Sequence, residues 1–265
     1  MDVIAMIGSW IEAWMNQRGG GNNWDWNGSN STFAGYTADY GLKIATTISY
    51  GAVSSSTTQV TANTASYGPI PVDTAVTFDH SYPSADEFTW TLSQVLSTTA
   101  SPSVNAGVPA VFPAEAGTTF PVDLTVTQAQ TAAEGNLWTQ SAPFMLPAGQ
   151  VVTVSMIVSE TAASADALVT AVVSGSVAAG LNSPWNGHYF WFIPIAQLAQ
   201  EFNTDPQVTV VGANVQFSVP ASFTGHAVVG SHLLFGSSAG PGSPLTGSRG
   251  FITHPAALLG RSPTT

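Results

Sequence analysis

Residues 88–93 of the chain read FTWTLS, and residues 120–127 read FPVDLTVT. In both stretches every second residue is apolar, and the residues between are mainly Thr, Ser and Asp. Successive side chains of a β-strand point to opposite faces, so this alternation predicts strands with one apolar face. The same pattern recurs at residues 152–156, 208–210 and 215–219, with clusters of Gly, Pro and Ser between the runs. From about residue 40 onward the sequence therefore predicts antiparallel sheet.

The polar positions of these strands carry hydroxyl groups in place of charges. Ser and Thr make up 59 of the 265 residues, whereas 7% of the residues are charged. Exposed strands commonly use charged side chains to discourage pairing with another sheet edge. Strands without that protection suit a surface that later pairs with a second copy of the chain.

Charge and cysteine content exclude several classes of function. The chain has 4 basic and 15 acidic residues, a formal net charge of −11, and no cysteine. Binding to a nucleic-acid backbone needs many Lys and Arg contacts, so we expect no nucleic-acid partner. Disulfides and Cys-ligated zinc are excluded. With 44% hydrophobic residues and eight Trp, the chain has enough apolar material for a folded core.

Two short helices are expected among the strands. Residues 3–15 place Val and Ile with two Trp at helical spacing, which predicts an amphipathic helix. We expect it to pack on the protein's own surface, with a membrane or partner contact as the alternative. A second helix is predicted at 195–202, between Pro194 and a turn at 203–206.

No arrangement of residues indicates catalysis. None of the five His belongs to an HExxH motif or a Gly-x-Ser-x-Gly context. The adjacent acids Asp86 and Glu87 point to opposite faces if they lie on a strand. No loop has the ligand spacing of a calcium site. We therefore expect no enzyme, no cofactor and no metal site.

Residues 76–81 read VTFDHS, residues 167–175 read ALVTAVVSG, and both flank further alternating stretches such as 88–92. In this order, residues 76–180 resemble the β-pore module of aerolysin-type toxins, in the epsilon-toxin and mosquitocidal-toxin branch. Residues 76–81 and 88–92 resemble the first long strand of that family. Residues 141–154 (SAPFMLPAGQVVTV) resemble its Pro-x-Gly turn followed by an alternating strand, and residues 167–175 resemble a further strand ending at Gly. Residues 223–231 (FTGHAVVGS) resemble the closing strand. The resemblance covers about 150 of the 265 residues and is one of pattern and order.

The resemblance implies a mostly β fold, with elongated antiparallel sheets of long strands and a small head that contains the N-terminal helix. It implies four regions along the chain. Residues 1–75 are expected to form a receptor-facing head, and residues 76–181 a pore-forming module. Residues 182–235 are expected to supply more of the head and the closing strands, and residues 236–265 a flexible C-terminal tail that is a candidate propeptide.

In the family, a soluble protein that is secreted or released binds a target-cell surface, forms a homo-oligomer on the membrane and inserts one hairpin per subunit into a transmembrane β-barrel. The hairpin expected here spans about 88–127. Between its two alternating strands lies an apolar tip at 108–113, and no Lys or Arg occurs from 44 to 248. Four prolines at 102–121 depart from the pattern of barrel strands. The residues expected to meet lipid are Phe88, Trp90, Leu92, Val108, Val111, Phe112, Phe120, Val122, Leu124 and Val126.

Three further sets of residues follow from this interpretation. Glu115 and Asp123 would line the lumen and make it cation-selective, because rings of acid repel anions. Arg249 is a candidate site of proteolytic activation. The receptor, a glycan or a protein, is expected to meet aromatic side chains of the head: Trp24, Trp26, Trp185, Tyr189 and Trp191.

A different class of function fits many of the same residues. A non-lytic β-sandwich, either a carbohydrate-binding lectin-like protein or a structural protein, would also have alternating strands rich in Ser and Thr. It explains the apolar tip between the two alternating strands of the expected hairpin less well. The segment at 94–102 loses the alternation, which allows a mobile surface loop in place of an insertion hairpin.

Overall fold

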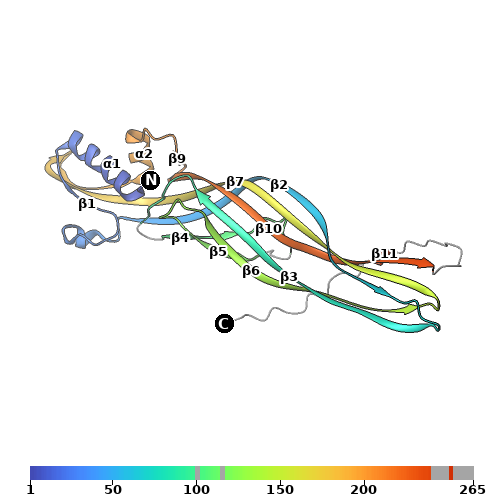
Figure 1. The fold of residues 1–265 in the computed structure, drawn as a ribbon. Coiled ribbons are helices and arrows are strands. Elements are labelled where there is room, and N and C mark those ends of the chain that lie inside the picture. The colour runs from blue at the N-terminus through green and yellow to red at the C-terminus, as the bar shows by residue number, and fades with distance from the viewer. Residues whose placement is uncertain (99–101, 114–116, 240–250, 253–265) are drawn as a thin grey trace.

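The computed structural model describes residues 1–98, 102–113, 117–239 and 251–252. The molecule is elongated, with helices gathered at one end and long strands running to the other (Figure 1). This is the mostly β, long-stranded architecture that the sequence predicts, with the N-terminal helix in a small head. The prediction of fold class is confirmed.

Five long strands form one antiparallel sheet. In spatial order they are β2 (Gly41–Tyr67), β7 (Gln150–Trp185), β10 (Asn214–Ala239), β3 (Thr74–Leu92) and β6 (Gln130–Leu146). β7 pairs with β2 on one side and with β10 on the other for most of its length. Four of these strands alternate buried or half-buried with exposed positions along part of their length, and β2 alternates half-buried with exposed ones, as the period-two pattern requires.

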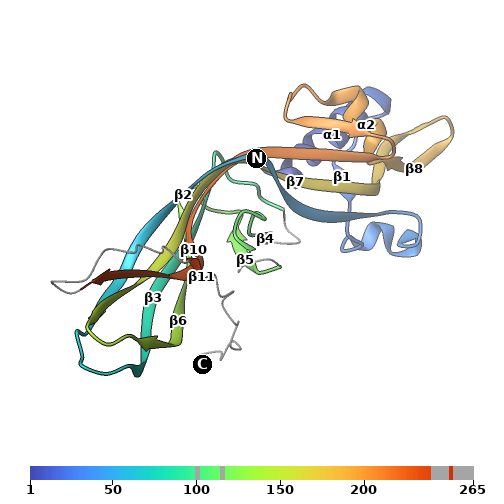
Figure 2. The ribbon, with the colours of Figure 1, turned by 90° about the vertical axis from the view of Figure 1, so that its right-hand side faces the viewer.

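The sheet divides into two layers toward the end remote from the helices, as Figure 2 shows. β10 pairs with β3 at residues 221–226, while β3 continues beside β6 from Trp90 to Thr74. A second hydrophobic core fills the space between the layers, with Phe78 and Leu146 from one layer and Val154 and Met156 from the other. This division makes the far part a sandwich of two and three strands.

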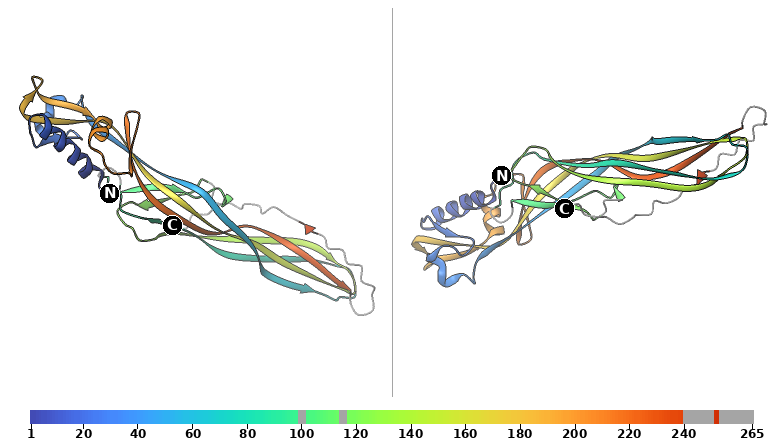
Figure 3. Two further views of the ribbon diagram at one scale, coloured as in Figure 1. Left: turned by 90° about the horizontal axis from the view of Figure 1, so that it is seen from above. Right: turned by 60° about the horizontal axis from the view of Figure 1, so that its bottom comes forward.

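Short elements cover the opposite end. They are α1 (Val3–Arg18), β1 (Asn23–Asp25), the 3-10 helix η1 (Ser31–Tyr36), β8 (His188–Pro194), α2 (Ile195–Phe202) and β9 (Val208–Val211). β1 and β8 pair with β7, and β9 pairs with β10. We call these six elements, with the strand ends to which they pair, the head, and the rest of the long strands the body. Both views in Figure 3 show the head at one end of the body.

Both predicted helices are confirmed. α1 begins at Val3 as expected and continues to Arg18, three residues beyond the predicted end. The Asp2 carboxylate caps it by accepting a hydrogen bond from the Ala5 amide at 3.0 Å. Its apolar face is buried, including Trp10 and Trp14, so it packs on the protein's own surface. α2 has the predicted bounds.

The head is built from separate segments of the chain. β2 runs from the head to the far end of the body, so the expected boundary at 75/76 lies at the start of β3, remote from α1 (Figure 1). The expected tail begins inside β10, which continues to Ala239. β11 (Phe251–Ile252) then pairs with Leu233 and Leu234 of β10. Among the described helices, none is long and apolar enough to cross a membrane.

Candidate membrane-insertion site

A small hairpin lies apart from the main sheet, between β3 and β6 in the chain. It consists of β4 (Ser103–Gly107) and β5 (Thr119–Asp123), which pair antiparallel with Val104 opposite Val122. Its side chains alternate between buried and exposed. Ser103, Asn105 and Asp123 face solvent, whereas Val104, Ala106 and Val122 are buried in the core cluster that includes the main sheet. The hairpin thus already has one apolar face and one polar face.

The segment after β4 inserts an aromatic ring beneath the sheet. The Phe112 side chain is 1% exposed. Its ring centroid lies 5.2 Å from that of Phe88 in an edge-to-face arrangement and 6.4 Å from that of Phe223. A Cβ atom at Gly225 would lie 2.9 Å from both the Phe112 and the Phe223 rings. The absence of a side chain at Gly225 therefore makes the seat for Phe112.

One tyrosine of β2 ties the hairpin to the sheet. The Tyr50 hydroxyl donates to the Gly107 carbonyl at 2.6 Å and accepts from the Trp90 indole Nε1 at 2.8 Å. Burial raises the pKa of Tyr50, and the hydrogen bond from Trp90 offsets part of that rise. The hydroxyl therefore stays protonated and available as a donor.

The structure divides the expected hairpin into two parts. Phe88, Trp90 and Leu92 are buried at the end of β3, where they pair with β10 in the main sheet. The remaining lipid-facing candidates lie in or beside the β4–β5 hairpin. Of these, Phe112, Val122 and Leu124 are buried. Val108, Val111, Phe120 and Val126 are half-buried.

Of the two lumen candidates, Asp123 is described and exposed, and Glu115 lies outside the described residues. One carboxylate oxygen of Asp123 accepts from the Thr125 amide and hydroxyl, both at 2.7 Å. The bond from the Thr125 amide, followed by that from its hydroxyl, lowers the pKa of Asp123. The carboxylate is therefore charged at neutral pH in this conformation.

The aromatic residues of the head lie on two opposite faces of its sheet. Trp24 and Trp191 both sit opposite Ala179 of β7, whereas Phe190 and Phe192 sit opposite the residues on either side of it. Because neighbouring positions of a strand point to opposite faces, the two sets are separated by the sheet.

The first face carries tryptophans beside α1. Trp185 and Trp191 have ring centroids 4.6 Å apart, and Trp14 of α1 lies 5.6 Å from Trp185. The Arg18 guanidinium lies over the Trp14 ring at 4.7 Å and forms an ion pair with Glu201 of α2 at 2.8 Å. The structure therefore joins two of the predicted receptor residues, Trp185 and Trp191, at the C-terminal end of α1.

The second face carries a cluster that sequence reasoning missed in part. The Tyr36 ring lies 5.7 Å from Phe190 and 5.5 Å from Phe192, and Phe33 lies beneath them. Tyr36 is 40% exposed and Phe190 38% exposed. Phe33 and Tyr36 belong to η1, which is a 3-10 helix and not a strand. They therefore do not lie in an alternating stretch, and the strand pattern could not identify them.

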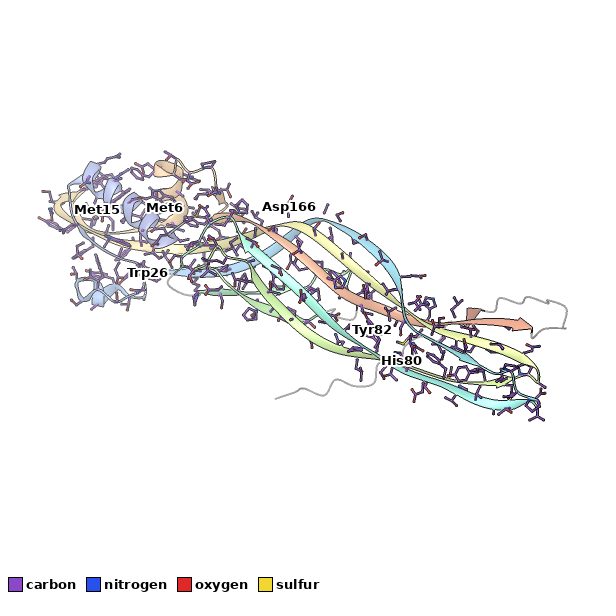
Figure 4. All side chains as sticks on the ribbon, viewed as in Figure 1. Met6, Met15, Trp26, His80, Tyr82 and Asp166 are labelled. Atoms are coloured by element: carbon purple, nitrogen blue, oxygen red, sulfur yellow. The ribbon has the colours of Figure 1, made fainter. Side chains whose placement is uncertain are left out.

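The other predicted receptor residues are dispersed. Tyr189 is 51% exposed. Trp24 is half-buried, and its ring fills the space that a side chain at Gly8 would occupy. Trp26 is half-buried near the junction of head and body (Figure 4), and its carbonyl accepts from the Leu42 amide. Arg249 lies outside the described residues.

Tyr50, Phe223 and Gly225 are the seat residues that the prediction did not assign to the site. The signal for two of them was present, since Phe223 and Gly225 begin the FTGHAVVGS stretch that resembles the family's closing strand. The contact of Gly225 with Phe112 joins residues more than a hundred positions apart, so strand pattern alone could not pair them.

The architecture is the aerolysin-like fold, which solved structures of β-pore-forming and crystal proteins share. Among solved structures, a chain of the Cry23Aa1 and Cry37Aa1 binary protein complex matches with a TM-score of 0.62 and 13% identity, over 96% of each chain. The β-pore-forming protein Mpp75Aa1.1 of Brevibacillus laterosporus matches with a TM-score of 0.58 and 12% identity, over 91% of this chain and 92% of that one. A non-toxic crystal protein from Bacillus thuringiensis matches with a TM-score of 0.55 and 10% identity, over 92% and 99%. No protein-family model and no curated sequence matches.

These similarities confirm the resemblance at the level of the fold. One of the similar proteins is described as pore-forming and another as non-toxic. The fold is therefore shared by proteins with different activities, and it does not by itself define the function of this chain.

Proposed function

We propose that the protein is a pore-forming toxin or defence protein that binds a target-cell surface, oligomerises there and inserts the β4–β5 hairpin into the membrane. The observation that carries the proposal is the docked hairpin. Its apolar side chains, among them Val104, Phe112 and Val122, are covered by the sheet in water. In a bilayer the same side chains would face lipid, so one apolar environment replaces another while the polar face lines the lumen.

The hairpin has to lengthen as it inserts. A strand that crosses a bilayer needs about 9–11 residues, whereas β4 and β5 have five each. Residues 108–113 and 124–127 supply further apolar positions: Val108, Phe112, Leu124 and Val126 continue the alternation, whereas Val111 falls between its positions. Phe88, Trp90 and Leu92 would join only if the end of β3 left β10, so we place them last in the sequence of events.

The edges of the main sheet support assembly into a ring. β2 pairs with β7 on one side, and no charged residue occurs between Lys43 and Asp73. β6 forms the opposite end of the strand order. A long, uncharged edge is a template for pairing with another strand. If the β2 edge of one copy pairs with the β6 edge of the next, the copies form a closed ring when the rotations between them add up to a full turn.

The head and the C-terminal segment complete the proposal. Exposed Tyr189 and the tryptophans Trp185 and Trp191 would contact the receptor, with Trp24 and Trp26 as neighbours in the head. β11 covers part of the β10 edge by pairing with Leu233 and Leu234. Cleavage at Arg249, just before β11, would detach this cover and allow activation by a protease.

The lectin-like or structural alternative has one specific observation in its favour, the non-toxic protein with the same fold. It predicts binding to a surface with a hairpin that stays docked. The two functions therefore differ in one observable, which is the environment of the hairpin on a membrane.

The test uses single cysteines in this cysteine-free chain, each labelled with a polarity-sensitive dye. Phe120→Cys and Val126→Cys report the apolar face, and Asp123→Cys and Thr125→Cys are the matched controls on the polar face. The labelled proteins are added to calcein-loaded liposomes and to insect and mammalian cells, with and without limited trypsin. We expect calcein release and a detergent-resistant oligomer with all four labelled proteins. We expect a blue shift of emission only for the apolar pair. With a salt gradient, the reversal potential should show cation selectivity.

Binding without release, and with emission unchanged at all four positions, would overturn the proposal and favour the non-lytic alternative. Release without alternation between the two pairs of positions would reject this hairpin as the inserted segment.

A further inference from the structure

The segment between β3 and β4 is attached to the start of α1. The Ser97 amide donates to the Met1 carbonyl at 2.8 Å, and the Val3 amide donates to the Ser97 carbonyl at 3.0 Å. These two bonds make a parallel bridge with Asp2 opposite Ser97. The Met1 nitrogen also donates to the Val95 carbonyl. We call residues 94–97 the arm, because the hairpin follows it in the chain.

The arm is also attached to the hairpin itself. Leu96 is fully buried, and its amide donates to the Leu124 carbonyl just after β5 at 2.9 Å. The Gln94 side chain donates to Gln207, which lies just before β9 in the head. The arm therefore joins three parts of the molecule: the hairpin, α1 and the loop before β9. For the hairpin to leave the sheet, the hydrogen bond between Leu96 and Leu124 has to open or the arm has to move with the hairpin.

α1 is anchored at its other end beside the predicted receptor residues. The amides of Asn182 and Ser183 in β7 donate to the carbonyls of Gly20 and Gly19, which follow the helix. Trp14 and Arg18 pack there with Trp185. Figure 4 shows Met6 at the end of α1 nearer the body and Met15 nearer the far end of the head. A helix of 16 residues is about 24 Å long, so one rigid element spans from the tryptophans to the arm.

We propose that the bridge between Asp2 and Ser97 is a latch that keeps the hairpin docked, and that contact with a receptor at the tryptophan end of α1 opens it by moving the helix. This inference rests on the proposed function and adds its regulation. Release of the hairpin is then coupled to the head through α1. A bridge of two backbone hydrogen bonds between exposed Asp2 and half-buried Ser97 is strong enough to hold a segment and weak enough to open.

The first test closes the latch covalently. Asp2 and Ser97 are bridge partners, which is a spacing that a disulfide can span, and the chain has no other cysteine. The variant D2C/S97C is compared in its oxidised and reduced forms. The matched control is T64C/S155C, a cross-strand pair of β2 and β7 whose hydroxyl oxygens lie 2.9 Å apart and which touches neither α1 nor the arm.

Two readouts separate the latch from pore formation. Hydrogen exchange of the β4 and β5 amides reports opening of the hairpin in solution and needs no membrane. We expect exchange in oxidised D2C/S97C to be at least tenfold slower than in the reduced form, with no difference for the control pair. Dye release should be lost on oxidation and restored by reductant in D2C/S97C, and retained in both forms of T64C/S155C.

A second variant weakens the latch and guards against a misfolded cysteine pair. Asp2→Ala removes the cap of the first turn of α1, whereas Ser9→Ala removes a hydroxyl bond to the Met6 carbonyl on the same helix, away from the arm. We expect faster β4 and β5 exchange in D2A than in S9A. Equal exchange in the oxidised and reduced forms of D2C/S97C, or equal exchange in D2A and S9A, would overturn the latch.

Failure of the proposed function gives a different result. In that case no form of any variant releases dye, while the exchange experiment still decides whether the latch holds the hairpin. If the oxidised form releases dye as fast as the reduced form, pore formation stands and the latch is rejected as its control.

Discussion

Two short excursions of the chain dock on the same long sheet, and they are held in opposite ways. One is the β4–β5 hairpin with its connecting segment in the body. The other is the head loop at residues 25–40, which contains η1. The head loop is fixed by a buried carboxylate from within the loop, whereas the hairpin is fixed by neutral groups from the rest of the molecule.

In the head loop, the Asp25 carboxylate accepts hydrogen bonds from several groups of the same loop. Its carboxylate accepts from the Trp26, Asn27 and Asn30 amides at 2.8–3.2 Å and from the Tyr40 hydroxyl at 2.6 Å. Burial alone would raise the pKa of Asp25, but the bonds from Tyr40 and the three amides outweigh it and the pKa is lowered. Burial and the Asp25 charge raise the pKa of Tyr40 to about 12. If this loop moved into lipid and lost these hydrogen bonds, the Asp25 carboxylate would be a buried charge without partners.

The hairpin has contacts of another kind. Phe112 packs on Phe88 and Phe223, and Tyr50 supplies a neutral hydroxyl to Gly107. Aromatic packing is regained when a ring enters lipid, because both environments are apolar. The difference shows why one of two similar excursions is suited to leave the sheet and the other is suited to stay.

The largest expected effect breaks the head loop and spares the hairpin. Asp25→Asn replaces one carboxylate oxygen by an NH2 group, which leaves two of the four donors without an acceptor. This loss should lower the free energy of unfolding by about 3 kcal/mol. Near-UV circular dichroism and hydrogen exchange should show loss of order at residues 25–40 with unchanged β4–β5 exchange. Loss of order in both regions would show that they are one cooperative unit, against the comparison.

The pH dependence of the same loop has a defined sign. The folded pKa of Asp25 is below its ordinary value of 3.8, so its contribution is complete above that pH and is lost as the pH falls through the lowered value. The folded pKa of Tyr40 is above 10, so its contribution is complete below pH 10 and is lost as the pH rises toward about 12. The wild-type head loop should therefore loosen at both extremes, and D25N should lose the acid transition.

The sequence predicted the long strands and both helices because these depend on local periodicity. The alternation at 88–93 identified a strand with a buried face, and the Val3–Trp14 spacing identified α1. It assigned 88–93 to the hairpin, whereas the structure pairs this stretch with β10. Pairing depends on contacts between distant residues, which a local pattern does not contain. The same reason hid Tyr50, whose two partners lie 57 and 40 positions away along the chain.

A smaller effect than that of D25N is expected from a substitution that loosens the hairpin and spares the head loop. Gly225→Ala would place a methyl group 2.9 Å from the Phe112 and Phe223 rings. Overpacking of this kind costs about 2 kcal/mol, and the ring of the separate hairpin can move more easily than β10. The β4 and β5 amides should exchange about 30-fold faster, and dye release should need less receptor or protease. Gly230→Ala on the same strand is the control, since no atom lies within 4 Å of its added Cβ. An equal effect of both substitutions would show that the seat of Phe112 has no special role.

The smallest expected effect sharpens the account of the hairpin. Tyr50→Phe keeps the ring, which packs on Phe223 with centroids 5.4 Å apart, and removes the hydroxyl that joins Gly107 to Trp90. Two partners lose one shared group, so hairpin docking should weaken by about 1 kcal/mol, or roughly fivefold in exchange of the β4 amides. Tyr67→Phe is the control, because its hydroxyl reaches the Thr77 carbonyl at 3.5 Å, far from the hairpin. If Y50F exceeds G225A in effect, a polar contact is the main attachment. The hairpin would then resemble the head loop, and its release would require loss of a hydrogen bond that lipid cannot replace.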